Sequence, residues 1–345
     1  MHLDLGGRPL HTRALSVTLA QRADGRLDAQ GVLLDLRKSG FVPCGGDLGT
    51  PGIVHHMLLD AVIDPAGAAG PVLAELAARQ PNVAFEPSTL TGGESCRDPI
   101  GRLDALLGTP LDADFARRLS AALGGPLGCS HILTLAQLLG ATVGWALGPG
   151  GAVAVDPARR PGERVFRRDL LVDGSRQAEG DLELLAQLTD VCFAQAPAVA
   201  RPMDRLAGVL ELRAWARVAL PGVTLTELRA AQRQRGRDDL DRVDWVDRSP
   251  AAARAAGLSL FRGISGALLD RLSGDPADRP LLDAMLLFDP TFIQVCGALS
   301  DQWAAQAMAA DSILAMGGMP DSCYMWRRAG ALDRLRGPND PFPSF

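Results

Sequence analysis

The chain has 345 residues, of which 47% are hydrophobic and 22% charged, and its formal net charge is −5 at pH 7. This is an ordinary globular composition, with enough apolar residues for two cores or one large core. The arginines are scattered along the chain, so the sequence has no basic patch of the kind that binds nucleic acid. We therefore expect neither DNA nor RNA as a partner.

The N-terminal sequence MHLDLGGRPLHTRALS has no basic segment followed by an apolar one, which is the pattern of a secretory signal. No apolar run reaches the roughly 20 residues of a membrane span. Both observations predict a cytoplasmic protein that does not bind a membrane. The six cysteines are too few for a disulfide scaffold in a chain of this size, so we expect them to be thiols.

The first half begins with a predicted β-hairpin over residues 13–38, with Asp24-Gly25 at its turn. Residues 53–64 predict a third strand. Its two-residue period places His55 on the inward face with Met57, and His56 on the other face. The following residues 71–79 begin with proline and predict a short helix.

Two further helices are predicted before the middle of the chain. Residues 111–125 have acidic side chains in the first turn and glycines at the end, as helix termini prefer. The sequence Gly128-Cys129-Ser130-His131 then opens a longer apolar helix over residues 132–147. Beyond it, residues 148–162 are rich in glycine, proline and alanine, and this composition predicts a domain boundary.

The second half repeats the order of the first. Residues 163–188 repeat the hairpin, residues 208–220 the third strand and residues 224–234 the short helix. We interpret the chain as an internally duplicated α+β unit, an antiparallel meander followed by helices, with two copies packed as a pseudo-dimer. The expected parts are a first repeat (1–150) carrying a Cys/His site, a degenerate second repeat (151–316), and a C-terminal segment (317–345) that could close the site.

The two predicted copies differ in their polar residues. In the alignment of the halves, Phe292-Ile293-Gln294-Val295 stands opposite Gly128-Cys129-Ser130-His131. Core residues thus replace a thiol and an imidazole. This difference indicates a single specialised site in the first copy.

That site combines two imidazoles with two thiols: His55, Cys96, Cys129 and His131. These are the N and S ligands that zinc prefers, in the number that a tetrahedral site needs, although their spacing matches no zinc finger. A second interpretation makes Cys129 a nucleophile, with a pKa lowered at the helix N-terminus and His131 or His55 as its base. A third makes all four buried structural residues.

The C-terminal segment offers further candidates. Tyr324 and Arg327 could supply a phenol and an anion-binding guanidinium to a carbonyl or carboxylate substrate. Alternatively, Trp326 packs this segment onto the body of the protein. We expect Arg13 and Asp35 to form structural ion pairs rather than to take part in chemistry.

Four elements follow one another in the first half: Asp24-Gly25 with Gly31 and Asp35 in the hairpin, His55-x-Met57 on a strand, an isolated Cys96, and Gly128-Cys129-Ser130-His131 opening a helix. This order resembles an uncharacterised bacterial family known only as a domain of unknown function. The resemblance covers about the first 150 residues, implies the site positions, and brings no established activity, although members look like accessory or catabolic proteins. The matching residues are Asp24, Gly25, Gly31, Asp35, His55, Met57, Cys96, Gly128, Cys129 and His131.

No dinucleotide-binding, P-loop, serine-hydrolase or zincin motif occurs, so no nucleotide cofactor is expected. The function we predict is a metal-dependent lyase, isomerase or hydrolase, with zinc or another divalent metal, acting on a small apolar oxygenated substrate such as an aromatic or alicyclic catabolite. The alternatives are a metal-free Cys/His enzyme and a non-catalytic accessory protein with a structural metal site. A homo-oligomer is compatible with all three.

Overall fold

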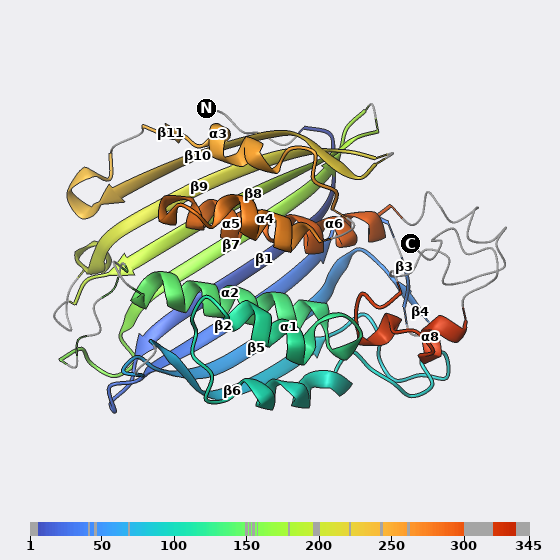
Figure 1. The fold of residues 1–345 in the computed structure, drawn as a ribbon, viewed down its shortest axis with the longest axis horizontal. Coiled ribbons are helices and arrows are strands. Elements are labelled where there is room, and N and C mark those ends of the chain that lie inside the picture. The colour runs from blue at the N-terminus through green and yellow to red at the C-terminus, as the bar shows by residue number, and fades with distance from the viewer. Residues whose placement is uncertain are drawn as a thin grey trace.

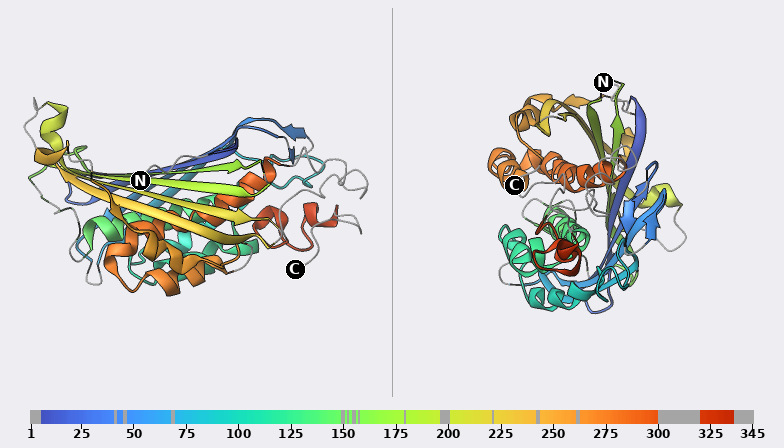
Figure 2. Two further views of the ribbon diagram at one scale, coloured as in Figure 1. Left: turned by 90° about the horizontal axis from the view of Figure 1, so that it is seen from above. Right: turned by 90° about the vertical axis from the view of Figure 1, so that its right-hand side faces the viewer.

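The computed structural model describes residues 6–40, 42–44, 47–67, 70–148, 151, 153, 156, 158–178, 180–195, 201–220, 222–241, 244–260, 263–299 and 320–335. Within them, a nine-stranded antiparallel sheet carries its long helices on one face (Figure 1). Seen from the end, the sheet curves around these helices (Figure 2). The predicted α+β class is confirmed.

Each half of the chain contributes one meander to this sheet. The order is β11-β10-β9-β8-β7-β1-β2-β5-β6, and β3 (Val42–Cys44) and β4 (Asp47–Gly49) form a separate small sheet. The first half supplies β1 (Arg8–Gln21), β2 (Leu27–Arg37), β5 (Gly52–Asp64) and β6 (Val72–Asn82). The second supplies β7 (Arg164–Arg176), β8 (Leu182–Phe193), β9 (Leu206–Ala219), β10 (Thr224–Gly236) and β11 (Val246–Asp247).

The two meanders meet at the β1–β7 pair in the middle of the sheet. Leu15 pairs with Leu170 there, and both side chains are buried against the helices. The pairing is symmetric about Leu15 and Leu170. Arg13 lies opposite Val172 on one side, and Val17 lies opposite Arg168 on the other. Alternate residues of both strands therefore face one continuous core.

The predicted first hairpin and third strand are confirmed. Gly25 has the positive φ of +84° that its turn requires, and His55 faces inward with Met57. The predicted helix at residues 71–79 is wrong, because this segment is strand β6. Residues 224–234 are likewise strand β10 rather than a helix. Alanine, leucine and glutamate favour a helix locally, but backbone pairing with β5 and β9 outweighs that weak preference.

The described helices are α1 (Phe115–Leu123), α2 (Ser130–Leu147), α3 (Ser249–Ala252), α4 (Ile264–Leu272), α5 (Arg279–Met285), α6 (Phe288–Gly297) and α8 (Ala331–Arg334). Short 3₁₀ helices occur at Asp98–Leu106, Gly125–Leu127, Pro202–Arg205, Arg237–Asp239, Ala253–Ala255, Pro276–Asp278 and Tyr324–Trp326. The predicted helices at residues 111–125 and 132–147 correspond to α1 and α2.

Helix α2 lies beside α5 and α6 across the curved face of the sheet (Figure 1). His131 at the start of α2 contacts Gln294 of α6, whereas Trp145 near its end lies by Arg168, which binds Asp283 of α5. The α5–α6 pair therefore runs antiparallel to α2. By length and composition α2 could cross a membrane, but 56% of it is buried inside the fold.

Candidate functional site

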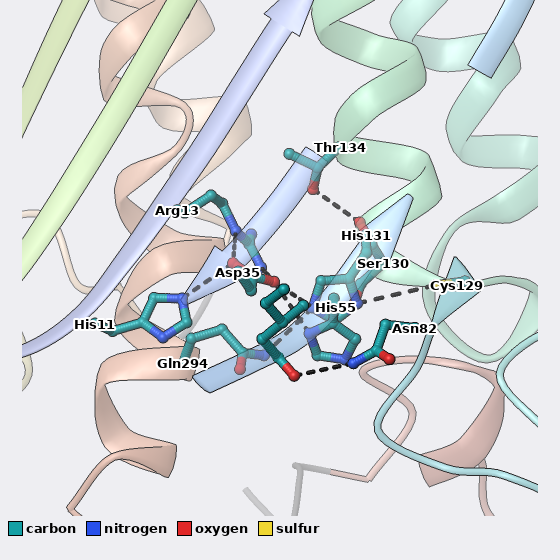
Figure 3. A network of polar contacts seen from close by, with 11 residues as sticks. His11, Arg13, Asp35, His55, Asn82, Cys129, Ser130, His131, Thr134 and Gln294 are labelled. Carbon is teal, nitrogen blue, oxygen red and sulfur yellow. Dashed lines mark hydrogen bonds and ion pairs between the residues drawn. The ribbon is translucent and has the colours of Figure 1, made fainter. Parts of the chain in front are cut away.

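Asp35 is the centre of a buried polar cluster (Figure 3). It continues the inward face of β2 after Leu27, Ala29 and Leu33, and none of its surface is exposed. Arg13 on the neighbouring strand donates two hydrogen bonds to it, Nε to Oδ1 at 2.8 Å and Nη2 to Oδ2 at 2.9 Å. This two-point pairing compensates for burial of both charges.

Three histidines from three different elements surround the same carboxylate. His11 Nε2 of β1 lies 3.0 Å from Oδ1, and His55 Nδ1 of β5 lies 3.1 Å from Oδ2. His131 Nε2 of α2 is also 3.3 Å from Oδ2. The β2–β5 register places His55 directly opposite Asp35. The His55 and His131 rings stack with their centroids 3.6 Å apart.

The charge state of the cluster follows from burial and the arginine. Burial acts to raise the pKa of Asp35, but Arg13 and the hydrogen bonds from the histidines hold that pKa well below its usual range. Burial lowers the pKa of His11 and His55 and brings that of His131 to about 3. The cluster is therefore one ion pair with three neutral imidazoles, and neutral imidazole is the form that binds metals.

Asp35, His55 and His131 can hold a metal ion together. One ligand atom from each lies within 4.8 Å of the other two. Two imidazoles and a carboxylate suit zinc and other divalent first-row metals, and three protein ligands leave positions open for water or substrate. The donor set therefore fits a catalytic type of metal site.

Cys129 lies on the far edge of His131. Its Sγ is 3.8 Å from Nδ1, whereas Asp35 faces Nε2. Because the two ring nitrogens point in opposite directions, an ion shared with Asp35 at Nε2 is out of reach of the thiol. Burial raises the pKa of Cys129 and outweighs the backbone N–H groups of Ile132 and His131. The expected lowering of this pKa at the helix terminus is therefore wrong.

Cys96 lies outside the group formed by Asp35, His55 and His131. It packs against the apolar cluster around Phe85 and Trp326, and its backbone N–H donates to the Phe85 carbonyl at 3.3 Å. Of the four predicted ligands, the structure thus brings His55 and His131 together and places Cys129 against His131.

The predicted C-terminal segment reaches the loop before α2. The Tyr324 N–H donates to the Gly128 carbonyl at 2.8 Å. The Tyr324 ring stacks under the Arg327 guanidinium at 4.0 Å, and Arg327 forms an ion pair with Glu94. These side chains therefore interact with each other and with Glu94. Of residues 317–345, those before 320 and after 335 lie outside the described residues.

The sequence predicts structural ion pairs for Arg13 and Asp35, although Asp35 also belongs to the family resemblance. It places Gln294 among the core residues of the second copy and indicates no role for His11. A signal for three of these residues was nevertheless present. His11, Arg13 and Asp35 occupy inward positions of strands on which most other inward residues are apolar. Polar groups at such positions need partners from neighbouring strands. Gln294, whose Nε2 lies 3.3 Å from His131 Nε2, comes from a distant helix and left no such signal.

A groove opens beside the cluster, between α2 and the α5–α6 pair, with a volume of about 860 Å³. Arg13, His131, Asp289 and Gln294 line it, and the wall continues along both helices as far as Arg279. His131 is 13% exposed, so it is the member of the proposed metal set that reaches the groove. Cys129 is not among the lining residues.

The second half contains a similar buried ion pair without histidines. Arg168 donates to Asp190 from Nε and Nη2 at 2.7 Å, with the 22-residue separation that also relates Arg13 to Asp35. Arg168 also donates to Asp283 of α5 at 2.6 Å. The β8–β9 register pairs Asp190 with Leu210, an apolar residue.

Comparison with known proteins gives one match. Neither the curated proteins nor the solved structures contain a match to this chain. The resemblance predicted for about the first 150 residues is confirmed by a family model whose range includes Asp35, His55, Cys96, Cys129 and His131. Residues 11–144 of the chain match the family described as "Protein of unknown function (DUF2889)".

Proposed function

We propose that this protein is a divalent-metal-dependent enzyme, with zinc as the first candidate metal, that carries out lyase, isomerase or hydrolase chemistry on a small, largely apolar, oxygenated substrate. Asp35, His55 and His131 are the proposed ligands. The observation that carries the proposal is the convergence of three ligand atoms within 4.8 Å beside a groove of about 860 Å³.

A metal at this position supplies a Lewis acid for a carbonyl or a bound water. Arg13 keeps Asp35 ionised and fixes the orientation of its carboxylate through two hydrogen bonds. Cys129 contacts Nδ1 of His131 and thereby favours the ring orientation that directs Nε2 toward Asp35. A cytoplasmic location and catabolic role are part of the same proposal.

We also infer that the chain arose by duplication, with the site in the first repeat (1–150), a degenerate second repeat (151–316) and the C-terminal segment (317–345) closing the site. Its support is the order of strands and the matching Arg–Asp pairs. With the separation of 155 between Arg13 and Arg168, His55 corresponds to Leu210, its position in the β8–β9 register. The alignment of the halves places Val295 opposite His131. In the structure, however, the helix residue that contacts Arg168 is Asp283.

A metal-free enzyme is the alternative that one observation favours. Cys129, His131 and Asp35 follow one another in the order nucleophile, base and orienting acid. However, the Cys129 residue is only 6% exposed and burial raises the pKa of its thiol, so it is poorly placed to attack a substrate. The metal-dependent proposal agrees better with this burial.

The proposal is tested by elemental analysis of protein purified without a histidine tag and dialysed against zinc. We expect about one equivalent in the wild type, a loss of tight binding in His55→Ala and His131→Ala, and retention in Cys96→Ser. His56→Ala is the matched control, because His56 lies on the opposite face of the same strand.

Three results would contradict this proposal. If the wild type takes up no divalent metal, the protein is not metal-dependent. If wild type and His131→Ala bind equal amounts of metal, His131 is not a ligand and the proposed ligand set is wrong. If Cys129→Ser loses the metal and His55→Ala keeps it, the ion binds near Nδ1 of His131, beside the thiol, and not at the proposed position.

A further inference from the structure

The wall of the groove on α2 consists mainly of small or polar side chains. They recur at spacings of four and three residues, so they share one face of the helix. Packed helices normally fill the seam between them at an axial separation of about 8 to 10 Å. Here the seam stays open instead. The residues are Ser130, Thr134, Gln137, Ala141, Gly144 and Gly148.

The shape of the groove follows from this stripe. At about 1.5 Å per residue, the distance from Ser130 to Gly148 is roughly 27 Å. The opposite wall presents Leu282 of α5, Leu286 from the connection between the helices, and Ile293 of α6. A long groove with aliphatic side chains on one wall and mainly small or polar ones on the other suits an elongated, largely apolar molecule that carries a polar group.

Two groups define the polar end of the groove: the Arg13 Nη1 nitrogen, which Asp35 does not bind, and the Asp289 carboxyl. Arg13 is 1% exposed, and its Nη1 has no hydrogen-bond partner among the described residues. A buried donor of this kind is costly unless an acceptor reaches it. The Asp289 carboxyl, likewise without an ion-pair partner in the described part of the chain, lines the same groove, and burial raises its pKa to about 6.

We propose that the groove binds an elongated, uncharged carbonyl compound, whose oxygen accepts a hydrogen bond from Arg13 Nη1, and that Asp289 discriminates against carboxylates. The inference rests on the proposed function for the reaction at that end, whereas binding itself requires no metal. The ion pair of Arg13 with Asp35 leaves that cluster neutral, so the charge of Asp289 decides the selectivity at neutral pH.

Calorimetric titration with dodecan-2-one, hexan-2-one and dodecanoate tests this inference, with metal-free and zinc-loaded protein in parallel. We expect dodecan-2-one to bind at least tenfold more tightly than either other probe. In Asp289→Asn the preference for ketone over carboxylate should fall by roughly tenfold. Asp270→Asn, an exposed acid on α4, is the control and should leave the preference unchanged.

Ala141→Trp tests the length of the site, because its indole would occupy the middle of the groove. This variant should lose affinity for dodecan-2-one and keep that for hexan-2-one, which also shows that it folds. Tighter binding of dodecanoate than of the ketone, or unchanged selectivity in Asp289→Asn, overturns the inference. Loss of zinc uptake with retained ketone binding would instead contradict the proposed function alone.

Discussion

At the scale of single residues, Asp35 holds the site together, because it joins two strands and a helix through Arg13, His55 and His131. The sequence contained the histidines in recognisable positions, so that half of the site was predictable. The carboxylate was less so, because an acid and an arginine on neighbouring strands also suit an ordinary ion pair. The distinction depends on how many side chains meet one carboxylate, and this requires the tertiary fold.

Replacement of Asp35 by Asn should destabilise the protein by about 3 to 5 kcal/mol, because it leaves the Arg13 charge buried without a counter-ion. The double replacement Arg13→Met with Asp35→Leu should cost less than the sum of its single replacements. Urea unfolding curves measure both. Additive costs would mean that the two side chains do not interact as the structure indicates.

Asp289 should make stability depend on pH. Its pKa, about 6 in the folded protein against an ordinary 3.8, means that the fold favours the protonated acid. Its contribution is therefore favourable at low pH and is lost as the pH rises from about 4 to 6. Asp289→Asn should be more stable than the wild type by about 1 to 2 kcal/mol at pH 7.5, with the difference vanishing near pH 4. Thermal unfolding at both pH values checks this, and a pH-independent difference would contradict it.

At the scale of elements, the strands and long helices were predictable from periodicity wherever burial is one-sided. Strand β6 was not, since its alanine, leucine and glutamate composition suits a helix and only pairing with β5 makes it a strand. The start of α2 is fixed more tightly than its sequence implies. The Gly128 carbonyl accepts the Tyr324 N–H, and a Cβ on Gly128 would lie 2.5 Å from the Leu123 carbonyl oxygen.

Gly128→Ala should therefore displace the first turn of α2 and with it His131. We expect a loss of about 1 to 3 kcal/mol in unfolding free energy, together with weaker zinc uptake. Gly266→Ala on α4 is the control, because nothing lies within 4 Å of its added Cβ and alanine favours the helix. Normal zinc uptake by Gly128→Ala would show that the position of His131 does not depend on Gly128.

At the scale of the whole molecule, the pairing of β1 with β7 could not be predicted from sequence. Both strands have the same alternating pattern as their neighbours, and neither sequence specifies which other strand it pairs with. The prediction of two packed copies did not specify whether the halves share a sheet, and the structure shows that they do. Contacts between strands more than 150 residues apart form only after long loops close, so they leave little local trace.

A fragment of residues 1–148 should reveal this shared edge. Removal of β7 exposes the free side of β1, and an unpaired apolar strand tends to pair with another copy. Size-exclusion chromatography with light scattering should show association, which Ser16→Lys and Thr18→Lys should reduce. A folded fragment that stays monomeric would show that the edge is protected in another way.

The symmetric register around Leu15 and Leu170 bears on how such a protein can evolve. If the chain arose by the proposed duplication, its single-copy ancestor would have formed a homodimer. The β1 strands of the two subunits would have paired with each other, and each subunit would have carried an identical cluster. Fusion into one chain removes that identity, because each half then mutates independently. One buried arginine can remain with histidines while the other is held by Asp190 and Asp283, so a stabilising ion network and the proposed metal site can be selected separately.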